Sequence, residues 1–158
     1  MWESLLPFFE WCDKTWVGTT IRESRLYFPI IETFHLFALT LLFGAILMIN
    51  LRIFGLILKS EPVSQVHKDI KPWMFWSLVA ILVTGTMLFL SEAMKCFASG
   101  PFQVKMAFLF AAIIFHFTIH RYFARRDQFN PILGKLAAVI SILLWLGVGV
   151  GGRAIGFL

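Results

Sequence analysis

The sequence predicts an all-α membrane protein, a bundle of four transmembrane helices with a short interfacial helix at the N-terminus. Hydrophobic residues occupy 59% of its 158 positions and charged residues only 15%, against about 25% in ordinary soluble domains. The mean hydropathy is +0.81. The apolar residues gather into four stretches, each near the roughly 20 residues that cross a hydrocarbon core. We therefore expect one integral membrane domain over residues 1–158 and exclude a large soluble catalytic domain.

The first predicted element is an interfacial helix over about residues 4–16. Aromatic Phe8 and Trp11 stand there beside Glu10 and Asp13, a pattern typical of a helix that lies in the membrane surface. The segment carries acids where a secretory signal would carry Lys or Arg, and no small-residue cleavage site follows. We expect it to remain in the mature protein and not to cross the bilayer.

Four transmembrane spans follow, connected by polar segments that contain proline. Each span is so continuously apolar that its helical periodicity is weak, and its length and polar flanks define it instead. The expected spans cover about residues 27–51, 73–90, 106–123 and 136–152, and the expected loops include 59–71, 96–103 and 125–131.

The distribution of basic residues predicts the orientation. Eight of the 14 Lys and Arg residues lie in or beside the first and third connections, and the other six share their side with six of the nine acids. By the positive-inside rule, the two basic connections face the cytoplasm and both termini lie outside. We interpret the net charge of +5 as a signal for orientation and for contact with the lipid bilayer, not with nucleic acid.

The two cysteines, Cys12 and Cys96, fall on the predicted outer side. An oxidising compartment would permit a disulfide between the N-terminal helix and the second connection. Free thiols in an apolar setting are an equal alternative, and no CxxC spacing indicates a redox pair.

Two histidines inside spans are the leading candidates for cofactor ligands. With about 1.5 Å of rise per residue, His35 lies about 5 Å outward of the midpoint of its span, and His116 about 3 Å inward of its own. The two therefore lie at similar depth on antiparallel helices. Facing imidazoles in a helix bundle are usual axial ligands of a low-spin b-type haem, so we expect His35 and His116 to bind haem iron.

Charged side chains near the outer boundary complete the expected haem site. Glu32, one turn from His35, is expected to pair with Lys105 or Arg153 or to accept a proton, because an unpaired carboxylate there is costly. The cations expected to neutralise the haem propionates are Arg22, Lys105 and Arg153.

His67 and His120 are weaker candidates for a second haem or metal site. His67 precedes the second span by several residues, so pairing it with His120 requires that helix to begin well outside the membrane. His116 and His120 also have the i,i+4 spacing that can hold one transition metal from one helix face. No Cys, Asp or Glu is expected at similar depth, which weakens the indication of a metal site.

Two other functions remain open on the sequence alone. Glu32, His35, His116 and His120 could form the polar path of a metal-ion or small-solute transporter, although the fourth span offers no protonatable group at its midpoint. Alternatively, the histidines only hydrogen-bond neighbouring helices. The protein is then a cofactor-free accessory subunit of a larger membrane complex, or a homo-oligomer.

Several short segments are distinctive when taken together, namely IRES at 21–24, PIIETFH at 29–35, LRIFG at 51–55, TG at 84–85 with LF at 88–89, PFQVK at 101–105, FH at 115–116 and GR at 152–153. With them the chain resembles, over nearly its whole length, a family of small bacterial four-helix membrane proteins of unknown function. The family usually has Asp at the position of Asn50, and Asn-Pro in place of Gly100-Pro101.

The architecture is also similar to the four-helix b-type cytochromes and, more loosely, to the copper-resistance membrane proteins. This similarity implies one b-type haem, with a second only if His67 and His120 supply another ligand pair. We expect electron exchange with quinone or a partner redox protein, in the bacterial inner membrane with both termini periplasmic. Two imidazole ligands leave no open iron position, so electron transfer is favoured over oxygen activation and an enzymatic reaction is left open.

Overall fold

Four helical rods form the molecule, and the computed structural model describes residues 2–157 of the chain. Every regular element in that range is helical, which confirms the predicted all-α class. All four rods are long and apolar enough to cross a bilayer, so the chain is a multi-pass membrane protein. The rods are α3 (Tyr27–Ile53), α4 (Val63–Ser91), a composite of α6 (Gly100–Phe115), η2 (His116–His120) and α7 (Arg121–Ala124), and α8 (Pro131–Ile155).

The rods extend beyond the predicted spans because local capping sets where helices begin. Ser99 accepts a hydrogen bond from the backbone of Phe102 at the start of α6, and Asn130 accepts one from Ile132 at the start of α8. A proline stands in the first turn of both helices, where its missing N–H costs nothing.

The largest difference from the prediction concerns α4, which begins ten residues before the predicted span at residue 73. The expected loop over residues 59–71 is wrong from Val63 onwards, where the chain is already helical. Hydropathy missed this part because its side chains are polar, although polar residues such as Lys and Gln form helices readily. The early start of α4 brings His67 into the bundle.

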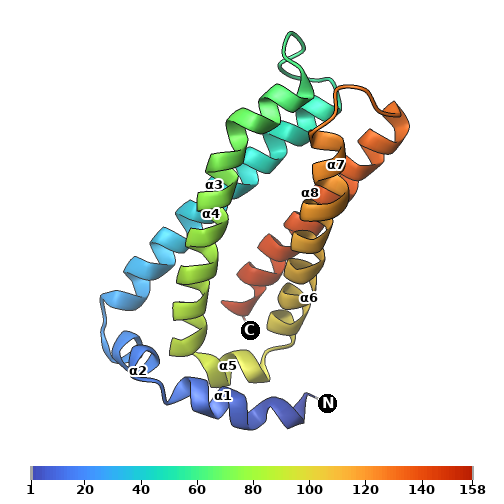
Figure 1. Ribbon diagram of the computed structural model, residues 1–158. Coiled ribbons are helices and arrows are strands. Elements are labelled where there is room, and N and C mark those ends of the chain that lie inside the picture. Colours follow the sequence, from blue (N-terminus) through green and yellow to red (C-terminus); the bar gives the residue numbers. More distant parts are fainter. Residues whose placement is uncertain (1, 158) are drawn as a thin grey trace.

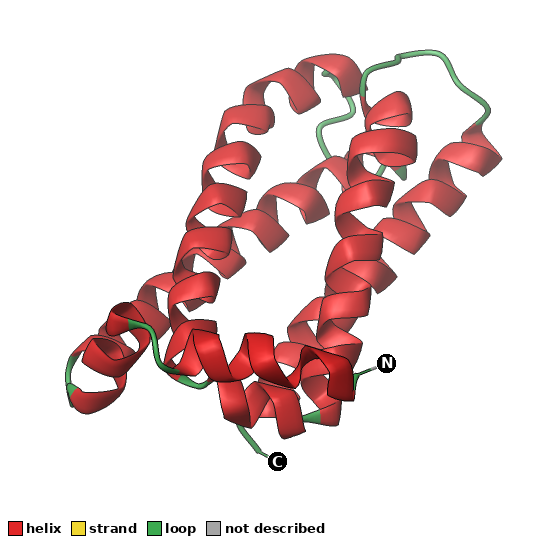
Figure 2. Ribbon diagram, turned by 60° about the horizontal axis from the view of Figure 1, so that its bottom comes forward, coloured by secondary structure: helices red, strands yellow, loops and turns green. Residues whose placement is uncertain are grey.

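The N-terminal segment forms two short helices where one was predicted over residues 4–16. Thr15 divides them, because its side chain accepts a hydrogen bond from the backbone N–H of Gly18 and so starts a second helix. The first helix packs against another short helix, in the connection between the second and third rods (Figure 2). These elements are the 3₁₀ turn η1 (Glu3–Leu5), α1 (Leu6–Asp13), α2 (Trp16–Glu23) and α5 (Ala93–Ala98), the last of which occupies part of the expected loop 96–103.

The rods pack as two antiparallel pairs, α3 with α4 and α6 with α8 (Figure 1). Contacts between α3 and α8 join the two pairs. Within the described range, the backbones of α4 and α6 come close to each other at few points or none. One end of the bundle, here called the terminus end, carries α1, α2, α5 and the C-terminal residues (Figures 1 and 2). The opposite end, the loop end, carries the connections 54–62 and 125–130.

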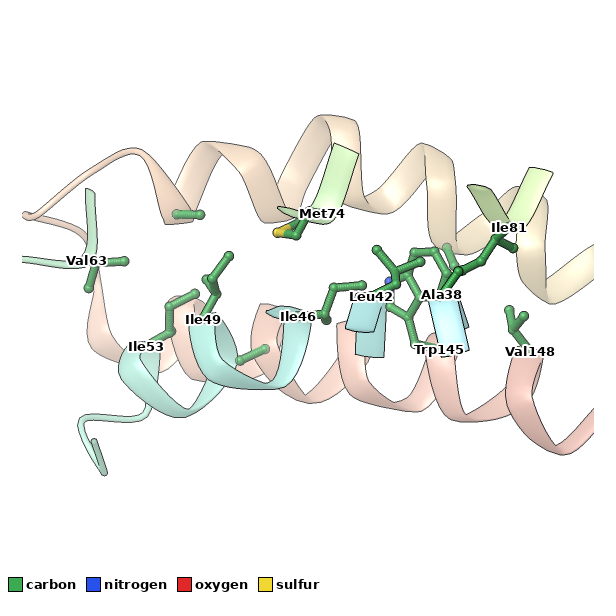
Figure 3. Close-up of a cluster of buried hydrophobic side chains, with 13 residues drawn as sticks. Ala38, Leu42, Ile46, Ile49, Ile53, Val63, Met74, Ile81, Trp145 and Val148 are labelled. Atoms are coloured by element: carbon green, nitrogen blue, oxygen red, sulfur yellow. The ribbon is translucent and has the colours of Figure 1, made fainter. Parts of the chain in front are cut away.

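The buried core follows the face of α3 that meets α4 and α8. Leu42 and Ile46 lie one turn apart on this face, and Trp145 of α8 lies beside Leu42 and Ala38 (Figure 3). In each rod, no more than 33% of the most hydrophobic 18-residue window is buried inside the protein, and the rest is at its surface. An apolar surface of that extent is suited to lipid contact.

Candidate functional site

The structure brings three of the four histidines together near the loop end. His67 lies in the second turn of α4, and His116 and His120 are the first and last residues of η2. Their exposed fractions are 6%, 8% and 0%. The rings of His116 and His120 stack with their centroids 5.0 Å apart, one at each end of the π-helical turn. Such turns within α-helices are frequent at functional sites.

Two other helices hold His120 in place. Its Nε2 atom lies 2.8 Å from Oδ1 of Asn50 on α3, and Nδ2 of Asn50 lies 3.3 Å from Oγ of Ser141 on α8. The amide nitrogen of Asn50 donates to Ser141, so its oxygen accepts and His120 Nε2 carries the proton. His120 Nδ1 is then unprotonated and carries a lone pair. The hydrogen bonds tie η2 to both α3 and α8.

Each of the three clustered histidines has a buried Nδ1 atom without a hydrogen-bond partner. Buried polar atoms nearly always have partners, and each exception calls for an explanation such as strain, a catalytic role, or a bound water or ion. These ring nitrogens are the only such side-chain atoms in the part of the chain that the structure describes. The unused hydrogen-bonding and ligating capacity of the bundle is therefore concentrated here.

A cavity of about 60 Å³ lies between α4 and η2. His67 lines it from α4 and His116 from η2, while Lys71 and Arg121 contribute two cationic side chains. The rest of the wall is apolar or aromatic and consists of Leu42, Ile46, Met74, Phe75, Leu78, Ile113, Phe117 and Trp145. The cavity thus combines two imidazoles, two cations and an apolar wall.

The basic side chains around the cavity have no carboxylate partner within ion-pair distance in the described chain. Lys71, Arg121 and Arg125 all lie within electrostatic range of His67. Uncompensated positive charge beside an apolar cavity favours a ligand with anionic groups. The ion pairs that do occur among residues 2–157 lie at the terminus end and are Arg22–Asp13 and Lys95–Glu92.

The structure does not bring His35 and His116 together. His35 Nδ1 lies 2.8 Å from Oγ of Thr84 on α4. Leu42, which lines the cavity with His116, is seven residues further along α3, so His35 lies about 10 Å closer to the terminus end. The expected similar depth came from spans that hydropathy made too short. In the longer rods the two histidines lie further from mid-span, on opposite sides of it.

Lys105 and His35 belong to one region of the structure, and Glu32 does not join them. Lys105 is within electrostatic range of His35, and its side chain packs beside Gly151 and Gly152 of α8. Glu32 is exposed and forms no ion pair with a described residue. The expected pairing of Glu32 with Lys105 or Arg153 therefore does not form.

The two predicted arginines have other roles in the structure. Arg22 pairs with Asp13 and donates to the backbone oxygen of Ser91, so it fastens α1 and α2 to the end of α4. Arg153 lies over the ring of Phe157, with its guanidinium carbon 5.2 Å from the ring centroid. Neither residue lines the loop-end cavity.

Sequence reasoning missed four residues of this region: Asn50, Ser141, Lys71 and Arg121. Asn50 carried a signal, because an amide inside an apolar span is costly unless it is hydrogen-bonded. Lys71 and Arg121 were counted only as orientation charges. Their position beside the cavity depends on the early start of α4 and on the π-helical turn, which no hydropathy pattern reports.

The residues that could hold a bare metal ion are not gathered at one point. Within residues 2–157, no group of three or more His, Cys, Asp or Glu side chains is placed around a common metal position. The stacked rings of His116 and His120 are nearly parallel, with an interplanar angle of 26°, and do not converge on one ion. This geometry does not form the i,i+4 chelate considered from the sequence.

Cys12 and Cys96 are both free and both buried in one aromatic cluster between α1 and α5. Burial, with a smaller contribution from Glu92, raises the pKa of the Cys96 thiol to about 11. Burial also raises the pKa of Cys12. Both groups are therefore protonated and weakly reactive at neutral pH.

Comparison with known proteins gives a family and no function. No curated protein and no solved structure matches the chain. One family model, described as "Family of unknown function (DUF6644)", matches residues 8–158. That range contains all four rods, all four histidines, and Asn50 and Ser141. The chain therefore belongs to the DUF6644 family of proteins of unknown function.

Proposed function

We propose that the protein binds one b-type haem in the cavity between α4 and η2 and transfers electrons within the membrane. The observation that carries this proposal is that His67 and His116 line one apolar cavity from two different helices. Haem iron takes one axial ligand on each face, and helix bundles hold cofactors with side chains from facing helices. His67 thus takes the place of His35 as the partner of His116.

The other residues of the cavity fit a haem. Lys71 and Arg121 are suited to bind its two propionates, since neither has a carboxylate partner in the described chain. At about 60 Å³ the cavity admits only a few waters, so a macrocycle requires its wall to move. Phe75 and Phe117 line it and are 53% and 48% exposed, so rotation of these rings towards lipid would widen it.

Bound haem would supply a one-electron redox centre. His67 and His116 would hold it from both sides, which favours electron transfer over oxygen activation. Asn50 and His120 would keep η2, and with it His116, in a fixed orientation. We propose quinone or a partner redox protein as the exchange partner. The proposed location is the bacterial inner membrane, with the loop end cytoplasmic and both termini periplasmic.

Spectroscopy of the purified protein tests the proposal directly. The full chain is purified in mild detergent from cells supplied with a haem precursor. Oxidised and dithionite-reduced spectra are recorded, and a pyridine haemochrome assay counts haem per chain. We expect reduced b-type bands at about one haem per chain. His67→Ala and His116→Ala should abolish these bands without preventing membrane insertion, whereas His35→Ala should retain them.

A matched pair of lysine variants tests the propionate contact. Lys71 lines the cavity, and Lys68, three residues earlier on α4, does not. Lys71→Met should lower haem occupancy, and Lys68→Met should not. Haem that survives His67→Ala but disappears in His35→Ala would restore the ligand pair expected from the sequence. A colourless wild-type protein would contradict the proposal and favour the transporter or the accessory subunit.

A further inference from the structure

A second polar site lies around His35, towards the terminus end from the proposed haem cavity. The Thr84 hydroxyl has one proton, and Thr84 Oγ lies 2.6 Å from the backbone oxygen of Ala80, to which it donates. In its 2.8 Å contact with His35 Nδ1, the same hydroxyl must therefore accept. His35 is thereby held in the tautomer that carries its proton on Nδ1, so Nε2 is unprotonated, and the ring also lies within hydrogen-bonding reach of the Ile81 backbone.

The surroundings of His35 combine this acceptor with a cation. A Cβ added to Gly85 would lie 3.2 Å from His35 Cε1, so the imidazole lies close against the backbone of α4. Lys105 of α6 is within electrostatic range of His35 and has no carboxylate partner in the described chain. A Cβ on Gly151 would lie 3.1 Å from that of Lys105, which shows how closely α8 supports this side chain.

We propose that His35 and Lys105 bind the headgroup of a lipid-soluble quinol between the two helix pairs. A quinol hydroxyl can donate a hydrogen bond to the bare Nε2 of His35, and Lys105 can stabilise negative charge on a quinol oxygen as its proton leaves. A metal cation would be repelled by Lys105. A simple anion could not donate a hydrogen bond to an unprotonated imidazole nitrogen. A neutral donor that becomes more acidic on oxidation satisfies both groups.

The position of the site suits electron transfer to the haem, and this part of the inference rests on the proposed function. His35 lies about 10 Å along the bundle from the level of Leu42 in the cavity wall. Trp145 lines that cavity and lies beside Ala38, three residues from His35 on α3 (Figure 3). An aromatic side chain therefore lies along the way from one site to the other.

The reaction balances with haem as the one-electron oxidant. Haem held by His67 and His116 would accept one electron, so one quinol would become quinone by giving one electron to each of two protein molecules in succession. Its two O–H bonds break and two protons leave. Each proton goes first to His35 Nε2 and then to water, while Nδ1 remains bonded to Thr84. Removing the Thr84 hydroxyl would release the tautomer and reduce the fraction of His35 ready to accept.

Photolabelling with a diazirine-bearing ubiquinol tests the site independently of haem. The full chain in detergent, with any haem already reduced, is labelled without oxygen at increasing probe concentration, with unlabelled ubiquinol as competitor. Thr84→Val and His35→Phe should each weaken labelling about tenfold, the effect of one lost hydrogen bond. Thr86→Val is the matched control, because Thr86 lies on the same helix and bonds only to the backbone oxygen of Leu82. This variant should label like the wild type.

Stopped-flow reduction then tests the electron-transfer step. In Thr84→Val, reduction of the haem by a short-chain ubiquinol should slow about tenfold, while reduction by dithionite and haem content stay unchanged. Equal labelling in all variants would overturn the site, whatever the haem result. Loss of haem in His35→Phe would also overturn it, because His35 would then be an iron ligand. A colourless wild type would contradict the proposed function alone, since labelling would still decide whether a quinol binds at His35.

Discussion

Replacing Asn50 with alanine should destabilise the bundle by about 2 kcal/mol. Asn50 and His120 are both 0% exposed, and the hydrogen bond between them measures 2.8 Å. His120 Nδ1 already lacks a partner, so the variant would leave both ring nitrogens unsatisfied. A buried unsatisfied donor costs about 1–3 kcal/mol. Interhelical hydrogen bonds in membrane proteins average only about 0.6 kcal/mol where alternatives exist, and this sealed site offers none.

The free energy of unfolding can be measured by titrating the detergent-solubilised protein with SDS and following circular dichroism. Ser141→Ala is the matched comparison, because it removes only the 3.3 Å hydrogen bond to Asn50 and should cost about 0.6 kcal/mol or less. Asn50→Ala, His120→Ala and the double variant complete a double-mutant cycle. We expect the double variant to cost less than the sum of the single variants.

Two results would refute this reasoning. One is an Asn50→Ala cost no greater than that of Ser141→Ala. The other is strict additivity of Asn50→Ala and His120→Ala, which would mean that the two side chains do not stabilise one another. In either case the clustered histidines would owe their position to helix packing and not to the hydrogen bonds from α3 and α8.

Two further predictions concern groups outside the spans. Hydrogen bonds from the Ser64 backbone N–H (3.0 Å) and hydroxyl (2.9 Å) lower the pKa of Asp127. The stabilisation is thus present above the unfolded-state value of about 3.9 and is lost as pH falls through the folded-state value. Ser64→Ala should lower Tm at pH 7, and its difference from wild type should shrink towards pH 2; a constant difference would contradict the linkage. Because the Cys96 pKa is raised to about 11, only about a thousandth of this thiol is ionised at pH 8. Iodoacetamide should modify Cys96 slowly in the folded protein and quickly in SDS, and rapid modification in mild detergent would argue against the buried position.

The sequence was sufficient to predict the architecture because few backbone structures are stable across a bilayer. Apolar runs of this length must satisfy their backbone hydrogen bonds internally, and in lipid a helix does so. The ends of the helices were harder to predict. Hydropathy stops where side chains become polar, whereas α4 continues through a polar segment to Val63. For this reason the sequence placed His67 in a loop.

The sequence predicted that histidines inside the spans would form the candidate site, but not which of them would lie together. Polar residues inside apolar spans drew attention to His35 and His116, while Asn50 was overlooked although an amide in an apolar span is equally unusual. Which of them meet depends on the rotation and vertical offset of each rod, and these follow from packing. A shift of two turns separates His35 from the cavity that His116 lines.

The sequence by itself determined the number of rods, their helical nature and their membrane setting, because these depend on the length and composition of each segment. The tertiary structure alone decided that His67, His116 and His120 share one end of the bundle while His35 and Lys105 share another region. These residues are far apart in the chain, and only the packing of helix against helix fixes the distances between their side chains.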